Sequence, residues 1–326
     1  AFDYDAPGNG NTAAATFATG TPLGGSDVDK DFHIINDGEI QFKGKGTLDN
    51  GIGIEVRVEL ESFSTGDQID EVFVKVKSSL GTILIGANDT ALDAVAGSIG
   101  RTGGGIAGGA WDRDFTTVPG ATGHHLGDEG DDVAIHYYSP NISGFEFGVS
   151  WAPSTSSDDG DVDTKRDVTN SNDAISIGAA YAGSFGDVDF SIGGGYYTES
   201  DDDGDDEVQS YGGGVEFGID GFIIGGAIVL RDREVGLREE ELIQYGAGVE
   251  YETGPWVFGV SALYQELEDG DAVNQSVEGL VINAAVGYEL GDGVDLGFGV
   301  DYGQIELDGA PDYDAFGGQL LLGVKF

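Results

Sequence analysis

Residues 319–326 have the sequence Gln-Leu-Leu-Leu-Gly-Val-Lys-Phe, in which apolar side chains recur at every second position. Leu320, Leu322, Val324 and Phe326 form one set, and the other set is mixed in character. A period of two indicates a β-strand whose two faces meet different surroundings. Because chain ends fray unless they are held, a strand that continues to residue 326 is expected to be paired along its length, as in a closed barrel.

The same alternation recurs upstream in runs of about ten residues, the length that a tilted strand needs to cross a bilayer. Asn50-Gly51 and Asp220-Gly221 separate successive runs and favour tight hairpin turns. With a short run at Ala1–Asp5 counted first, and the residues after it up to about Asp37 interpreted as a loop, sixteen strands are predicted. The remaining runs are 39–45, 52–61, 72–77, 82–86, 133–138, 145–151, 174–181, 188–197, 208–218, 222–230, 242–251, 256–265, 277–290, 294–306 and 313–326.

Composition excludes several classes of protein. The chain has 60 acidic and 14 basic residues, a net charge of −46, and therefore repels the phosphates of nucleic acids. The absence of Cys excludes disulfide scaffolds and thiolate metal sites. No apolar run is long enough for a transmembrane helix. Since Met is absent as well, we expect that a leader has been removed.

The two faces of the strands differ in a way that indicates which one meets lipid. The apolar set often ends in Tyr or Trp, as in Trp256–Tyr264, which is typical of the interfacial girdles of membrane barrels. The opposite set carries Glu and Asp. A barrel of sixteen strands is too wide for side chains to fill, so the polar set is expected to face a water-filled lumen. Short turns alternate with long acidic loops, and an even strand count places both termini on the side of the turns.

Five basic residues share the polar parity of three consecutive strands and are predicted to form one patch on the inner wall: Lys43, Lys45, Arg57, Lys75 and Lys77. The long segment 87–132 interrupts the strand rhythm, and we expect it to fold inward and narrow the channel. Its acids would then face the basic patch across a confined aqueous gap: Asp89, Asp93, Asp112 and Asp114. In the alternative, the segment covers the mouth and the bases pair locally with Glu55, Glu59, Glu61 and Glu71.

Other polar clusters favour little chemistry. His124, His125 and His136 lack metal-ligand spacing. The acidic run of Asp201, Asp202, Asp203, Asp205 and Asp206 is a candidate for bound Ca²⁺, although a solvated acidic loop is the favoured interpretation because no Ca²⁺-binding motif is present. No cofactor is required by any motif, and neither a nucleophile elbow nor a phosphate loop is present, so an enzyme is not expected.

Four stretches carry a resemblance to a known family. Gly46–Glu61, Gly66–Lys77, Gly144–Trp151 and the terminal Phe326 are similar to the general porins of Gram-negative outer membranes. The resemblance implies an all-β fold: a 16-stranded antiparallel transmembrane β-barrel over residues 1–326, with long extracellular loops, short periplasmic turns and the third loop, 87–132, folded into the lumen. It also implies a homotrimer in a bilayer with lipopolysaccharide, and recognition of Phe326 by the barrel-assembly machinery.

The sequence therefore predicts an outer-membrane channel for passive diffusion of ions and small hydrophilic solutes that favours cations. A solute-specific porin with a binding track for sugars or small organic acids is the alternative. Two other classes of protein are weighed as alternatives. A barrel enzyme would have fewer strands and an exposed catalytic cluster. A soluble acidic all-β protein would need no detergent for extraction.

Overall fold

Sixteen antiparallel strands follow one another along the chain in a computed structural model, which describes residues 11–20, 32–62, 69–103, 132–155, 172–200, 206–235, 238–269, 275–307 and 313–325. The strands are β1 (Asn11–Gly20), β2 (Phe32–Thr47), β3 (Gly53–Ser62), β4 (Val72–Ser78), β5 (Gly81–Ala87), β6 (Val133–Tyr138), β7 (Phe145–Ala152), β8 (Asn172–Phe185), β9 (Val188–Ser200), β10 (Asp206–Ile219), β11 (Phe222–Val235), β12 (Arg238–Thr253), β13 (Trp256–Asp269), β14 (Gln275–Gly291), β15 (Val294–Leu307) and β16 (Tyr313–Val324). One short helical turn, η1 (Asp93–Gly97), lies between β5 and β6. No helix in the described ranges is long and apolar enough to span a membrane.

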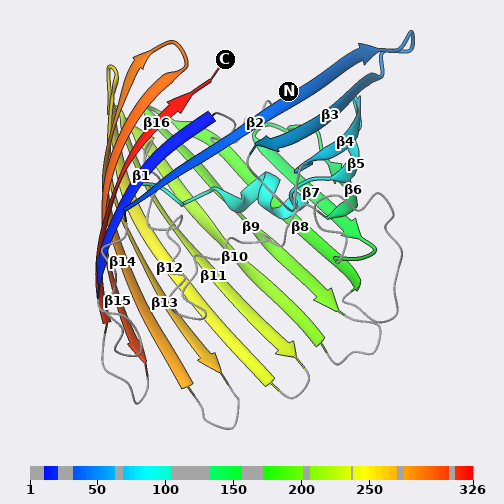
Figure 1. The fold of residues 1–326 in the computed structure, drawn as a ribbon. Coiled ribbons are helices and arrows are strands. Elements are labelled where there is room, and N and C mark those ends of the chain that lie inside the picture. Colours follow the sequence, from blue (N-terminus) through cyan, green and yellow to red (C-terminus); the bar gives the residue numbers. More distant parts are fainter. Residues whose placement is uncertain are drawn as a thin grey trace.

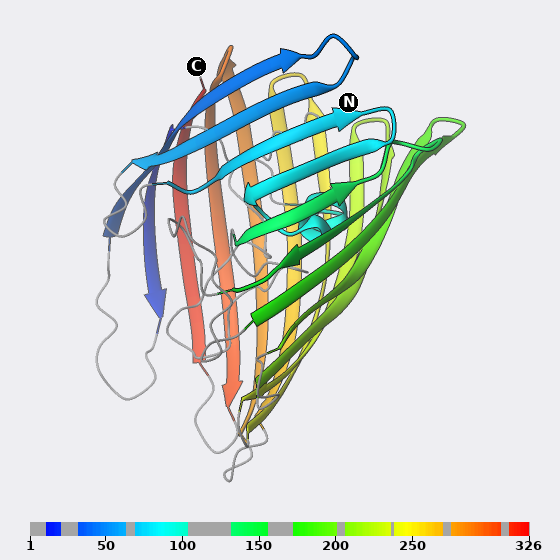
Figure 2. The same ribbon diagram turned by 90° about the vertical axis from the view of Figure 1, so that its right-hand side faces the viewer.

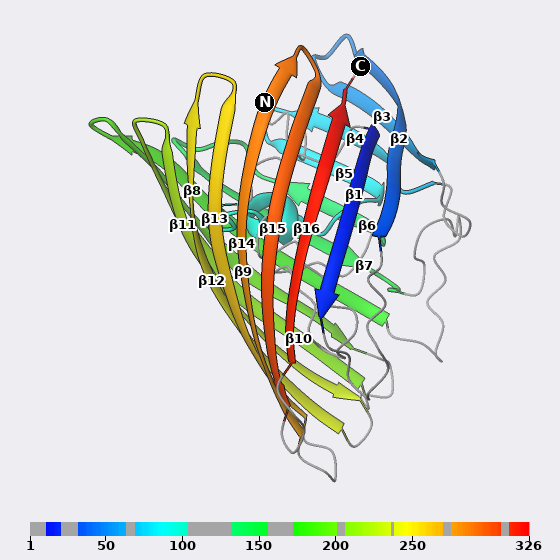
Figure 3. The same cartoon turned by 60° about the vertical axis from the view of Figure 1, so that its left-hand side comes forward.

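Each strand pairs with its neighbours in sequence, and β16 closes the sheet against β1 (Figures 1 and 3). Leu320 on β16 is opposite Ala15 on β1 and Phe298 on β15. The closing strand is therefore paired on both sides, as its alternation predicted. Asn11 is opposite Val324, at the same rim as the tight turn that joins β14 to β15, so the described ends of the chain lie on the side of the turns.

The first strand is not where the sequence pattern placed it. Ala1–Asp5 lies outside the described residues, and β1 is formed by Asn11–Gly20, within the stretch interpreted as a loop. β2 likewise begins at Phe32 rather than Glu39. The strand count of sixteen is nonetheless correct. Residues 11–20 are mainly Ala and Thr without strong alternation, and the ladders to β2 and β16 determine their conformation instead.

The two faces of the wall have opposite polarity. Ile192, Val260 and Phe298 expose 54, 51 and 42% of their surface on the outside. Gln244 and Asn283, which have the opposite parity, are fully buried within the barrel. Apolar side chains outside and polar ones inside are the reverse of a soluble β-sandwich.

The predicted hairpin turns form as expected. At Asn50-Gly51 the Asn50 side chain accepts a hydrogen bond of 3.2 Å from the Ile52 amide, and Gly51 has a φ of 84°. Asp220 and Gly221 both have positive φ, the geometry that a two-residue hairpin needs. An aromatic pair lies on the outer face beside the second of these turns, where the ring centroids of Phe222 and Tyr251 are 4.4 Å apart.

Candidate functional site

The chain turns into the barrel after β5 (Figures 1 and 2). Thr90 starts the short helical segment, since its hydroxyl accepts a hydrogen bond of 3.2 Å from the Asp93 amide. The Ala91 and Leu92 amides donate to the hydroxyls of Ser150 on β7 and Ser176 on β8, each at 3.2 Å. Residues 88–103 therefore lie against the inner wall and not over the mouth.

The same segment continues across the wall toward β13. Leu92 and Ala96 are buried in an apolar cluster with Tyr197 of β9. Further along, the Thr102 hydroxyl donates a 2.7 Å hydrogen bond to Glu216 of β10. The inward path is thus held at both ends of residues 88–103. The rest of the predicted constriction segment, residues 104–131, lies outside the described residues.

The five basic residues predicted to share a wall come from adjacent positions on β2, β3 and β4. Lys43 is opposite Arg57, and Lys45, Glu55 and Lys75 form one row across the three strands. Lys77 is opposite Gly53 at the next position. The structure therefore brings the five together in what we call the basic cluster.

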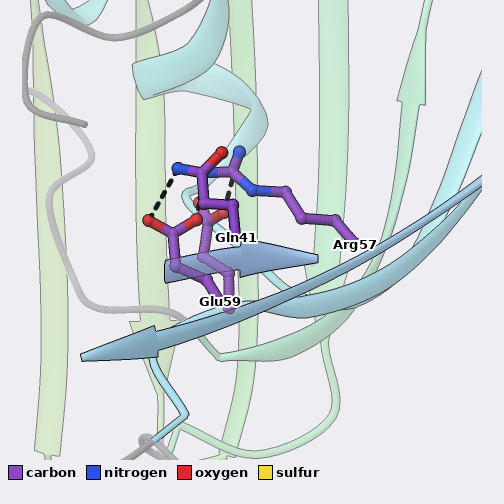
Figure 4. A network of polar contacts seen from close by, with 4 residues as sticks. Gln41, Arg57 and Glu59 are labelled. Atoms are coloured by element: carbon purple, nitrogen blue, oxygen red, sulfur yellow. Dashed lines mark hydrogen bonds and ion pairs between the residues drawn. The ribbon is translucent and has the colours of Figure 1, made fainter. Parts of the chain in front are cut away.

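Acidic side chains alternate with the basic cluster and pair with it. Glu55 is 2.7 Å from Lys77 and 3.7 Å from Lys45. The Arg57 guanidinium contacts both Glu59 and Glu71, the latter at 3.0 Å. Gln41 donates a 3.0 Å hydrogen bond to Glu59, and Figure 4 shows Gln41, Arg57 and Glu59 converging on one point of the inner wall. The local pairing that the sequence left open as an alternative is therefore present alongside the inward segment.

Of the four acids predicted on the inward segment, Asp89 and Asp93 are described. Asp89 lies close enough to the Glu71 carboxyl for its charge to raise the pKa of that group. Asp93 turns back over Gly97 of its own helical turn. Asp112 and Asp114 lie outside the described residues.

Phe73 is a member of this wall that the sequence analysis missed. It is 2% exposed, and the Lys75 ammonium lies 4.5 Å from its ring centroid. The Arg57 guanidinium is 5.8 Å from the same ring. Its position on the polar parity of β4, between Glu71 and Lys75, was the available signal, because an aromatic ring can hold cations through its face.

Glu71, just before β4, is a titratable group near neutral pH. Burial raises its pKa to about 8; the Arg57 guanidinium opposes this, whereas the charges of Glu59 and Asp89 add to it. Lys75 is a further charged neighbour. The pKa of Glu71 therefore lies well above that of an ordinary carboxyl, and the group loses its proton as the pH rises through about 8.

We expect the cation preference of the channel to increase between pH 7 and pH 9, because ionised Glu71 adds one negative charge to the inner wall. The reversal potential in a KCl gradient, recorded at both pH values, measures this change. In a Glu71→Gln variant the reversal potential should be the same at both pH values. If the variant showed the same change in reversal potential as the unmodified channel, another group would be responsible for it.

Most of the candidate metal ligands lie outside the described residues. His124, His125, Asp201, Asp202, Asp203 and Asp205 lie outside the described residues, and the side chain of Asp206, the first residue of β10, is not described. His136 is buried on the inner face of β6 and stacks on Tyr138. Within the described part of the chain, carboxylate oxygens of Glu39, Glu61 and Asp70 lie within 4.8 Å of one another and could hold a cation. These three residues come from different segments, so no local spacing indicated them.

Comparison with known proteins identifies the family. A family model described as Gram-negative porin matches residues 7–310. No curated protein sequence matches the chain. Among solved structures, the trimer form of in-vitro folded OmpT of Vibrio cholerae is similar with a TM-score of 0.67 at 14% identity, over 96% of this chain and 97% of that one. An anion-selective porin from Comamonas acidovorans is similar with a TM-score of 0.64 at 14% identity, over 97% and 98%.

These matches extend over nearly the whole barrel. They agree with the apolar outer face, the polar inner face and the closed topology. The chain therefore belongs to the Gram-negative porin family, and it is an outer-membrane β-barrel that acts as a diffusion channel and not as an enzyme.

Proposed function

We propose that this channel favours cations, and that segment 87–132 narrows it within a single barrel formed by residues 1–326. The similar Comamonas acidovorans protein is anion-selective, so the fold alone does not determine the sign of selectivity. The charges on the inner wall of this chain must determine it.

The distribution of charge around the wall carries the proposal. Strands β7–β10 and β13–β15 contain no Lys or Arg, and their inward positions include Glu146, Asp189, Glu216 and Asp301. Neutral donors accompany three of these carboxylates: Asn141 for Glu146, Thr102 for Glu216 and Asn283 for Asp301. A hydrogen bond from a neutral donor does not cancel the charge of a carboxylate, as a basic side chain would.

The basic cluster offsets this negative wall only weakly. Glu55 neutralises part of the charge of Lys45 and Lys77, and Glu59 does the same for Arg57. A permeating ion therefore meets ion pairs on one side and carboxylates on the other. Confinement lowers the effective dielectric constant, so these carboxylates attract cations more strongly than they would in bulk water.

Planar-bilayer recording of the purified protein tests the proposal. We expect unit current steps in symmetric KCl, and in a KCl gradient a reversal potential whose sign shows K⁺ to be more permeant than Cl⁻. A reversal potential of the opposite sign would show that the basic cluster governs selectivity. Saturating block by one sugar or small organic acid would instead support a solute-specific porin.

The assembly of the protein is also a proposal. OmpT of Vibrio cholerae is described in a trimer form, and we propose that this chain also forms a homotrimer in a lipid bilayer with lipopolysaccharide. Recognition of Phe326 by the barrel-assembly machinery remains a prediction, because Phe326 lies outside the described residues.

A further inference from the structure

The inner wall beneath the inward segment is built from glycines at the points where the segment crosses it. Gly178 of β8, Gly214 of β10, Gly248 of β12 and Gly259 of β13 form a path that we call the glycine track. Each of these glycines has the same parity as the inward-facing polar residues of its strand. Examples of such polar residues are Ser176 on β8 and Glu216 on β10. The track extends across much of the barrel circumference.

Main-chain atoms of residues 92–103 lie directly on this track. A Cβ atom at Gly178 would be only 2.8 Å from the Leu92 Cα. At Gly214 and Gly248 it would overlap the carbonyl oxygens of Ile99 and Thr102, respectively. At Gly259 it would overlap the carbonyl of Gly103. The segment is therefore closer to the wall than any side chain would allow.

The segment matches the track with glycines of its own. Gly100 has a φ of 86° and Gly103 a φ of 108°, conformations that residues with a Cβ rarely adopt. The Gly100 Cα would be 3.1 Å from a Cβ at Gly214. Backbone thus lies on backbone at these crossings.

Glycines in this sheet also serve a second purpose, and the two kinds can be separated. At Gly195 and Gly212 the nearest atoms to an added Cβ are carbonyl oxygens of Ile177 and Ile228, which belong to adjacent strands. Those glycines permit close contact within the wall itself. At Gly214 and Gly259, all three nearest atoms belong to the inward segment. Packing of the sheet therefore does not explain the glycines at these two positions.

We infer that the glycine track sets the aperture of the channel by allowing the inward segment to lie flat on the wall, an inference that rests on the proposed narrowing by segment 87–132. Interiors are close-packed, so a methyl group on the track must displace the segment. Because the wall lies on one side, that displacement is toward the pore axis. Gly214, Gly248 and Gly259 are then residues that determine the size limit for solutes.

Single alanine substitutions on the track provide the test. We expect Gly214→Ala, Gly248→Ala and Gly259→Ala each to lower the single-channel conductance by about 1.5-fold. The largest polyethylene glycol that enters the pore should also be smaller in these variants than in the unmodified channel. Gly218→Ala is the matched control on β10: its Cβ would meet nothing closer than Asp189 Cβ at 3.8 Å, so its conductance should stay unchanged. Track variants that conduct as well as Gly218→Ala would overturn the inference.

A measurement on the unmodified protein keeps the inference testable if track variants fail to insert. A segment held flat on the wall should exchange its amide hydrogens slowly, and hydrogen–deuterium exchange of the peptide covering residues 91–101 reports this. Rapid exchange of that peptide in the intact barrel would contradict the inference. The sign of the reversal potential tests the proposed cation preference, whereas conductance and polymer exclusion test the aperture. Failure of one proposal is therefore distinguishable from failure of the other.

Discussion

Arginine in place of Ile192 is expected to destabilise the barrel in a bilayer by about 2–4 kcal/mol, the cost of a charge on the lipid face near the midplane. Ile192 exposes 54% of its surface on the outer face of β9. It lies between Phe190 and Tyr196, two aromatic residues of the same parity on that strand. An arginine there must reach past one of them to find water.

The adjacent residue provides the control. Ser191 has the opposite parity, and its hydroxyl donates a 3.3 Å hydrogen bond to Glu216 on the inner wall. Ser191→Arg introduces the same side chain into the lumen, next to a carboxylate, and should change stability by less than about 1 kcal/mol. Equilibrium unfolding by denaturant in lipid vesicles measures both variants. Equal losses would mean that the two faces of β9 do not differ as described.

Loss of the acids that neutralise the basic cluster is expected to have the largest effect on selectivity. The double variant Glu55→Gln with Glu59→Gln removes the ionised partner of Lys45 and Lys77 and one of the two acidic partners of Arg57, which keeps its contact with Glu71. Glutamine keeps the size and hydrogen-bonding capacity of each side chain. We expect the permeability ratio of K⁺ to Cl⁻ to fall by about fivefold or more, since uncompensated charges in a confined pore act at low effective dielectric.

A second double variant controls for net charge. Asp187 and Asp220 are exposed at tight turns, so Asp187→Asn with Asp220→Asn removes the same two charges away from the inner wall. Its permeability ratio should stay close to that of the unmodified channel, because the surrounding salt solution screens exposed charges. If both variants shifted the ratio equally, selectivity would depend on overall charge and not on the basic cluster.

Local signals in the sequence predicted much of the barrel. The hairpin at Asn50-Gly51 depends on two residues whose conformational preferences are intrinsic. The face of each side chain follows from parity, so the shared wall of Lys43, Arg57 and Lys75 was predictable once three strands were placed in sequence.

Features that depend on distant segments were harder to predict. β1 forms because β2 and β16 offer it hydrogen-bonding partners, and its Ala- and Thr-rich sequence carries little signal of its own. The pairing of Arg57 with Glu71 depends on register between β3 and the residue before β4. The glycine track was not recognised, because glycine in a strand is ambiguous until the segment that crosses it is located.

The central claim is that polar side chains line a continuous water-filled path through a barrel with an apolar exterior. Single-channel recording of the unmodified protein in a planar bilayer tests it most directly. We predict discrete, persistent current steps whose size rises with KCl concentration. A correctly folded and inserted protein that gave no steps would contradict the account.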